Sequence, residues 1–148
     1  MTWTYYSSFD ELTPHHLYEI LKLRQDIFII EQECIYDDID GLDRESEHLL
    51  LHNINECLIG YLRIVPPQIK FDEYSLGRIA IKSDNRGKGL GKMIVEKGIE
   101  TVQSSGARDI RIEAQAHLIN FYENIGFKSV SAAYDIDGIP HLQMVLNS

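Results

Sequence analysis

The sequence predicts an α/β fold in which strands and helices alternate along a single domain. Short runs of apolar and β-branched residues, such as 76–81 and 110–114, are typical of buried strands. Residues 89–105 instead repeat apolar side chains at helical spacing. With 148 residues, 44% of them apolar and 25% charged, the chain is long enough for one substantial core. We therefore expect residues 1–148 to form one domain.

The individual elements follow from these patterns in chain order. Thr13 is a typical N-cap residue, and Pro14 suits the first position of the helix that follows it. One face of that helix is traced by Leu17, Ile20, Leu21, Arg24, Ile27 and Phe28. Gly106 is expected to end the second helix. Strands are expected at 2–6, 48–52, 58–65, 76–81, 110–114, 128–134 and 141–146, and helices at about 14–28, 89–105 and 118–125.

A glycine-rich loop, Arg86 to Gly91, joins an expected strand to the second helix. Such a loop leaves several backbone N–H groups unpaired at the start of a helix, where the helix dipole adds partial positive charge. Lys88 and Lys92 add full charges, and residues 76–97 hold six Lys or Arg against two acidic residues in a chain of net charge −9. The loop is expected to bind phosphate groups, and general nucleic-acid binding is not expected.

Two common nucleotide-binding patterns do not fit this loop. A nucleoside-triphosphate P-loop needs Ser or Thr after its Gly-Lys pair, but Met93 follows Lys92. A dinucleotide fingerprint needs the spacing G-x-G-x-x-G, whereas Gly87, Gly89 and Gly91 alternate. The phosphate ligand is therefore expected to belong to another class of cofactor.

Two motifs resemble the GCN5-related N-acetyltransferase (GNAT) superfamily. Arg86, Gly89 and Gly91 match its pyrophosphate loop, Arg/Gln-x-x-Gly-x-Gly/Ala. About thirty residues later, the segment 120–127 contains its Tyr-x-x-x-Gly-Phe signature, in which Gly126 suits the positive φ that ends a helix. Further residues resemble the ElaA-like branch of the superfamily, and they are Arg24, Phe28, Ile30–Gln32, Tyr36, Asp40, Gly41, Asp43, Glu47–Leu49, Ala114, Gln115, Asp137–His141 and Met144.

The resemblance implies the GNAT fold, a twisted, mostly antiparallel mixed sheet with helices on both faces. Two neighbouring parallel strands, here 76–81 and 110–114, would splay apart and admit acetyl-CoA. The pantetheine arm would pair with the backbone of the first strand, and the pyrophosphate would lie on the loop amides, which the Arg86 side chain would orient. The cofactor-binding residues implied are Ile79, Ala80, Ile81, Arg86, Gly87, Lys88, Gly89, Leu90, Gly91, Asn120 and Tyr122.

The implied reaction needs few catalytic side chains. An amine must lose a proton, attack the thioester carbonyl and expel the CoA thiolate, and positioning supplies most of the rate. Tyr122 lies where GNAT enzymes place a general acid, so it would protonate the thiolate; packing on the cofactor is the alternative role. Many relatives carry a Glu base on the strand at 76–81, which has no acid here. The base stays open among Glu113, His117, His48, His141 and a chain of water molecules.

An acidic stretch over residues 31–47 holds eight acidic residues against a single arginine. Three interpretations stay open: a solvated loop, a rim that attracts a cationic amine acceptor, and a calcium site. The calcium interpretation has the least support, because Asp38-x-Asp40-x-x-Asp43 lacks a twelve-residue loop closed by a bidentate Glu.

We expect an N-acetyltransferase that transfers an acetyl group from acetyl-CoA to a primary amine, either a small cationic amine or a peptidyl amine. The alternative is a non-catalytic acyl-CoA-binding sensor or partner module. No metal is expected, because Cys34 and Cys57 are too few for a zinc site or a disulfide framework. No membrane span or N-terminal signal is visible, so the cytoplasm is the expected compartment. A homodimer stays open, since strands near the end of the chain often mediate dimers in this fold.

Overall fold

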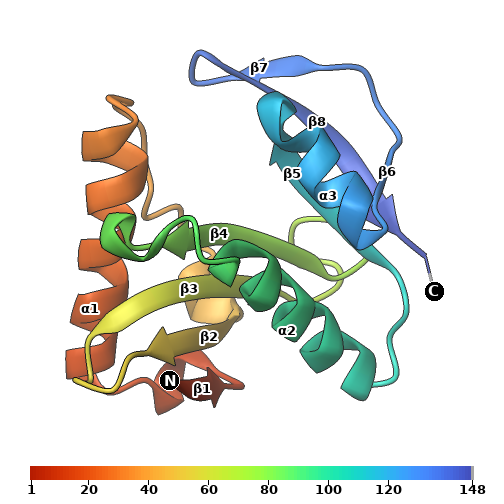
Figure 1. Cartoon of the computed structure of the whole chain (residues 1–148). Coiled ribbons are helices and arrows are strands. Elements are labelled where there is room, and N and C mark those ends of the chain that lie inside the picture. The colour runs from red at the N-terminus through yellow and green to blue at the C-terminus, as the bar shows by residue number, and fades with distance from the viewer. Residues whose placement is uncertain (148) are drawn as a thin grey trace.

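The strands form two four-stranded sheets in the computed structural model, which describes residues 1–147 (Figure 1). The first sheet is antiparallel and contains, in spatial order, β1 (Thr2–Tyr6), β2 (Glu47–His52), β3 (Leu58–Val65) and β4 (Ser75–Ile81). In the second sheet, β8 (Ile139–Leu146) pairs with β5 (Ile110–Gln115), β6 (Lys128–Ser129) and β7 (Tyr134–Ile136).

Strands β4 and β5 lie at the junction of the two sheets. Tyr74, just before β4, forms a parallel bridge with Ile110, and the Arg111 N–H donates to the Tyr74 carbonyl at 2.9 Å. Within residues 1–147 no further ladder pair joins β4 to β5, so the two strands diverge from this point. Figure 1 shows β5 and β8 leaning away from the first sheet. The expected pair of splayed parallel strands is confirmed.

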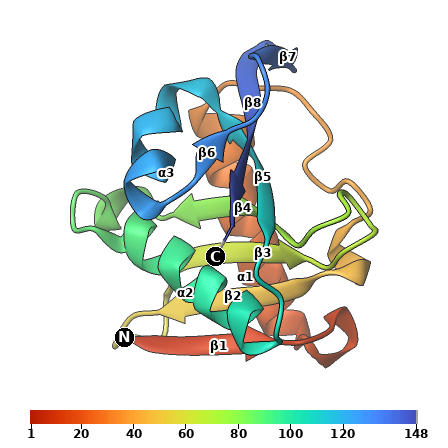
Figure 2. The same ribbon diagram turned by 90° about the vertical axis from the view of Figure 1, so that its right-hand side faces the viewer.

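Helices cover both faces of the first sheet, with α1 (Pro14–Arg24) on one face and α2 (Leu90–Ser104) on the other (Figure 2). Thr13 caps α1 as expected, since its side chain accepts the His16 N–H at 3.1 Å. Side chains alternate along β3, so Tyr61 packs with α1 and Leu62 packs with α2. Both faces of the first sheet are therefore buried.

The remaining helical segments border the junction of the sheets. The first helix continues past α1 as a π-helical segment, η2 (Gln25–Glu31), and so extends beyond the expected end near residue 28. Its buried residue Ile27 joins the core on the α1 face. The others are α3 (Ile119–Ile125) and the short 3-10 turns η1 (Phe9–Glu11), η3 (Asp43–Glu45), η4 (Ser83–Asn85) and η5 (Ala116–Leu118).

The expected single strand at 128–134 is wrong, because the structure divides it into β6 and β7. The Ser131 hydroxyl accepts the Gln143 N–H at 2.9 Å, a bond that a strand carbonyl would otherwise make. Residues 130–133 are also exposed, so no buried side chain holds this segment against the sheet. A side chain that satisfies the backbone in this way competes with the strand ladder.

The last strand, β8, begins at Ile139, two residues before the expected start at 141. Asp137 and Gly138 both have positive φ, +51° and +85°, between the paired residues Ile136 and Ile139. Two central residues with positive φ are typical of a tight β-hairpin turn. The β7–β8 hairpin therefore extends β8 by two residues at its N-terminal end. No helix within residues 1–147 is both long enough and apolar enough to span a membrane.

Candidate active site

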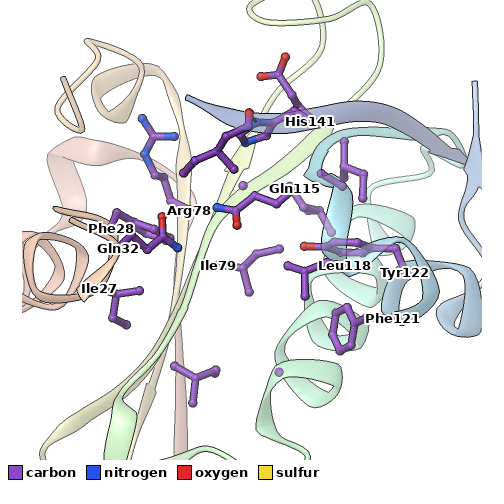
Figure 3. A pocket seen from close by; sticks show the side chains of 18 of the residues that line it. Ile27, Phe28, Gln32, Arg78, Ile79, Gln115, Leu118, Phe121, Tyr122 and His141 are labelled. Carbon is purple, nitrogen blue, oxygen red and sulfur yellow. Dashed lines mark hydrogen bonds between the residues drawn. The ribbon is translucent and has the colours of Figure 1, made fainter. Parts of the chain in front are cut away.

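A cleft of about 630 Å³ opens where β4 and β5 diverge. Its walls come from these two strands, the start of α2, segment η2, helix α3 and the β7–β8 hairpin. Figure 3 shows Ile79 from β4 and Tyr122 from α3 facing each other across the cleft. The elements that sequence motifs marked as functional therefore meet in one place.

A β-bulge shapes the β4 wall of the cleft. Two residues of β4, Arg78 and Ile79, oppose the single residue Leu62 of β3, because the pairing shifts between Tyr61 and Arg63. Arg78 has a φ of +48°, which a non-glycine residue rarely adopts. A bulge bends its strand and increases the local twist, which accounts for the divergence of β4 from β5.

The glycine-rich loop presents backbone N–H groups at one end of this cleft. Gly87 and Gly89 have φ values of +78° and +77°, and Gly89 is the N-cap of α2. Such values favour glycine over any residue with a Cβ atom. In the described part of the chain, the amides of residues 87–91 donate to no protein acceptor. These amides, together with the start of the α2 dipole, form a site for an anion.

The Arg86 side chain holds the loop in place. Its Nε donates to the Ile81 carbonyl at 3.1 Å, and its Nη1 lies 2.7 Å from Glu31 Oε2. The guanidinium therefore joins the end of β4 to segment η2. The expected role of Arg86 in orienting the loop for a cofactor stays a prediction.

Tyr122 projects from α3 into the cleft (Figure 3). Its ring packs edge-on against Phe121 and Phe127, at centroid distances of 5.0 and 5.8 Å. Burial raises the pKa of Tyr122 to about 12, so the hydroxyl is protonated at neutral pH. That hydroxyl forms no hydrogen bond with any residue of the described chain, which leaves a proton donor available to a ligand.

Glu113 reaches the cleft from β5 with both carboxylate oxygens engaged. Tyr134 donates its hydroxyl to Oε2 at 2.7 Å, and the Lys70 ammonium lies 3.1 Å from Oε1. Burial acts to raise the pKa of Glu113, but the Tyr134 hydrogen bond and the Lys70 charge outweigh it and lower that pKa. The carboxylate is thus a weak base that binds a primary ammonium.

The three histidines proposed as bases occupy different surroundings. His141 lines the cleft, and its Nδ1 lies 2.7 Å from the Ile139 carbonyl oxygen. Because a carbonyl oxygen only accepts, Nδ1 carries the proton in this bond and Nε2 of the neutral ring keeps its lone pair. His117 lines the cleft and is exposed. His48 does not line the cleft; it is buried between the Tyr61 hydroxyl at 2.6 Å and the Asp43 carbonyl at 2.9 Å.

Three aspartates of the 31–47 stretch, which do not line the cleft themselves, are paired with arginines. Asp43 accepts from Arg24 Nη1 at 2.6 Å and from Arg63 Nη1 at 3.0 Å, and both arginines are fully buried. Arg63 Nη2 also bonds Asp40 at 2.8 Å. Arg78 Nε lies 2.9 Å from Asp38 Oδ1.

This internal network changes the interpretation of the acidic stretch. Asp38 and Asp43 are buried, which excludes a fully solvated loop, and their carboxylates hold arginines of α1, β3 and β4. Burial acts to raise the pKa of Asp43, but the Arg24 hydrogen bond and the two arginine charges lower it. The charges of these aspartates are therefore largely neutralised by arginines within the protein.

The other expected cofactor residues are placed as follows. Ile79, Ile81 and Leu90 line the cleft, as do the loop residues other than Lys88. The Ala80 side chain is buried on the α1 face of the sheet, and the exposed residues Lys88 and Asn120 do not line the cleft. Lining residues that the sequence motifs did not mark include Lys70, Leu118, Phe121 and Ile136.

Comparison with known proteins supports the motif assignment. The model of the acetyltransferase (GNAT) domain family matches residues 23–148. UPF0039 protein sll0451 of Synechocystis sp. is 38% identical over 138 residues, which cover 93% of this chain and 90% of that protein.

Two solved structures resemble this one over 99% of both chains, each with a TM-score of 0.90. They are Escherichia coli ElaA, at 34% identity, and an acyl-CoA N-acyltransferase from Pseudomonas aeruginosa, at 31% identity. The chain therefore belongs to the acetyltransferase (GNAT) domain family, in its ElaA-like branch.

Proposed function

We propose that this protein is an N-acetyltransferase that moves the acetyl group of acetyl-CoA to a primary amine by direct attack in a ternary complex. Membership of the GNAT family supports acyl-CoA-dependent N-acyl transfer as the general activity. The main support from the structure is that one cleft combines a loop of amides with a protonated tyrosine hydroxyl, none of which has a hydrogen-bond partner among the described residues 1–147.

The cofactor would lie along β4 with its pyrophosphate on the amides of residues 87–91. The diverging edge of β4 offers backbone groups to the pantetheine arm, in the manner of an added strand. A backbone N–H near the bulge at Arg78 and Ile79 would polarise the thioester carbonyl as the oxyanion forms. No metal is needed for this arrangement.

In the chemical step, the amine nitrogen forms a bond to the acetyl carbon and the carbon–sulfur bond of the thioester breaks. Tyr122 would supply the proton that the departing CoA thiolate takes up. The Tyr122 pKa of about 12 keeps this proton on the hydroxyl until negative charge develops on the departing sulfur.

Among the candidate bases, the geometry favours His141 for taking the amine proton. Its ring is oriented by the Ile139 carbonyl and Nε2 is left to accept a proton. Glu113 is less suited, because its lowered pKa and its two bonded partners reduce its basicity. His117, which also borders the cleft, is the next candidate.

The contacts of Glu113 instead support a role for this residue in binding the acceptor. It already holds one primary ammonium, that of Lys70, so the cleft contains a carboxylate suited to the group that an amine acceptor presents. A small cationic amine or a peptidyl amine would take the place of Lys70. Because the acidic stretch is internally paired, this selectivity would come from Glu113 and not from a negative rim. The two free cysteines support a reducing compartment such as the cytoplasm.

The experiment that tests the proposal follows thiol release from acetyl-CoA against cationic, neutral and anionic primary amines. Calorimetric titration with acetyl-CoA runs in parallel. Release that depends on the amine and is fastest with a cationic one is the expected result. Tight acetyl-CoA binding without release across the panel would instead favour the alternative, a non-catalytic acyl-CoA-binding module.

A further inference from the structure

A cluster of histidines and one carboxylate lies outside the cleft, between the first turns of α1 and the end of β2. One ligand atom from each of His16, Glu19 and His52 falls within 4.8 Å of the other two. None of the three lines the cleft. Figure 1 shows the start of α1 beside β1 and β2, on the side of the first sheet away from β5 and α3.

The local structure explains how these side chains converge. Residues three positions apart on a helix share one face, which places His16 and Glu19 side by side on α1. His52 is the last residue of β2 and is buried against this face, with its Nε2 3.3 Å from Glu19 Oε1. His15 approaches the same carboxylate oxygen from the solvent side, at 3.5 Å.

The distances match those within a tetrahedral metal site. Zinc binds imidazole nitrogen and carboxylate oxygen at about 2.0–2.2 Å, which puts two tetrahedral ligands about 3.3 Å apart. The His52–Glu19 and His15–Glu19 separations of 3.3 and 3.5 Å are close to this value. The His16 and His52 rings lie 4.9 Å apart between centroids, and one nitrogen of each lies within 4.8 Å of the other.

A hydrogen bond outside the cluster also fits a metal site. The Tyr6 hydroxyl lies 2.6 Å from His16 Nδ1, which leaves Nε2 as the nitrogen available to an ion. Histidines that bind metals usually engage their second nitrogen in this way.

We propose that His16, Glu19 and His52 form a binding site for Zn²⁺ that joins α1 to β2, with His15 placed as the fourth ligand. Two imidazoles and a carboxylate suit a borderline divalent ion of this kind, whereas Mg²⁺ and Ca²⁺ prefer oxygen ligands alone. The ion would bind the native state and not the unfolded chain, and so would stabilise the fold. No sequence pattern predicts this site, because His52 lies 33 residues from Glu19 in the chain.

The test uses tag-free protein, freed of metal with EDTA, with both cysteines replaced by serine to exclude binding by thiols. Calorimetric titration with ZnCl₂ should show one ion per chain with a Kd of about 1 µM or below. Glu19→Gln and His52→Gln should each weaken binding at least tenfold. Zn²⁺ should raise the Tm of the parent by several degrees and leave that of His52→Gln unchanged.

His117→Gln is the matched control, since it removes a histidine far from the cluster and should bind Zn²⁺ as the parent does. If His52→Gln fails to fold, His16→Gln replaces a less buried ligand and gives the same test. Absence of saturable binding below 100 µM Zn²⁺, or equal affinity in the ligand variants, would overturn the proposal and leave a simple hydrogen-bonded cluster. Neither result depends on acetyl transfer.

Discussion

Two charged segments border the cleft, and they differ in where their polar groups find partners. In the loop 86–91, the amides of residues 87–91 have no acceptor within the described residues 1–147, and every residue of the loop except Lys88 lines the cleft. The acidic stretch 31–47 uses its central aspartates to bind buried arginines. An unpaired group can bind a ligand without first losing a protein partner, so we propose that the loop is the binding element. The central aspartates of the acidic stretch have a structural role. The following substitutions and measurements test this difference between the two segments.

Gly89→Asp should reduce acetyl-CoA affinity more than a thousandfold. The variant places a negative charge where phosphate must approach and a Cβ atom at a φ of +77°. Calorimetric titration measures the loss. Gly106→Asp is the control, because Gly106 has a similar φ of +94° and open space around it at the far end of α2. Equal loss in both variants would attribute the effect to backbone strain and contradict the assignment of the loop.

Asp43→Ala should lower the free energy of unfolding by about 3–5 kcal/mol, because it leaves two buried arginines, Arg24 and Arg63, without a shared carboxylate. Urea denaturation measures the change. Asp37→Ala, an exposed position in the same stretch, should change it by less than about 0.5 kcal/mol. Similar small effects in both variants would show that the acidic stretch is not structural.

Tyr122→Phe should lower kcat about a hundredfold and leave acetyl-CoA affinity almost unchanged. The variant keeps the ring packed on Phe121 and Phe127 but removes the proton that the departing thiolate needs. Steady-state kinetics with the best amine of the panel, together with calorimetry, separate the two effects. A fully active variant would reduce Tyr122 to a packing role.

His141→Gln should lower kcat at least tenfold and remove the acidic limb of the pH–rate profile, because Nε2 can no longer accept the amine proton. His117→Gln is the control with the same change of side chain at another position of the cleft. If the profile of His141→Gln keeps its acidic limb, then His117 or a chain of water molecules serves as the base.

Lowering the pH should destabilise the wild-type protein more than it destabilises the Asp43→Ala variant. The pKa of Asp43 is lowered in the folded state, so its stabilising effect is complete above the ordinary carboxyl pKa of about 4 and is lost as the pH falls further. Melting curves at pH 6 and pH 3 measure the difference. Parallel decreases of Tm in both proteins would show that Asp43 has an ordinary pKa in the fold.

Sequence patterns were sufficient for the elements whose signal is local. The cap at Thr13, the positive φ of Gly126 and the splay of β4 from β5 are all confirmed. The boundaries near the end of the chain were not predictable, since the break after β6 depends on a bond from Gln143 to the Ser131 side chain. A bond between a side chain and the backbone of a neighbouring strand leaves no periodic pattern in the sequence from which it could be predicted.

The site was predicted in part, for a similar reason. Loop residues and Tyr122 belong to motifs, so their place in the cleft could be inferred. The pairing of Asp40 with Arg63 and Arg78 could not, because the partners lie 23 and 38 residues apart and their charges look solvated in the sequence. Lys70 lies outside any motif, and only the fold brings it to Glu113.

A crystal structure with bound acetyl-CoA would show where the cofactor lies relative to the loop and to Tyr122. We predict that the pyrophosphate accepts hydrogen bonds from the amides of residues 87–91, and that the thioester sulfur lies within hydrogen-bond reach of the Tyr122 hydroxyl. A cofactor bound away from the β4–β5 cleft, or a sulfur beyond the reach of Tyr122, would contradict this account of the site.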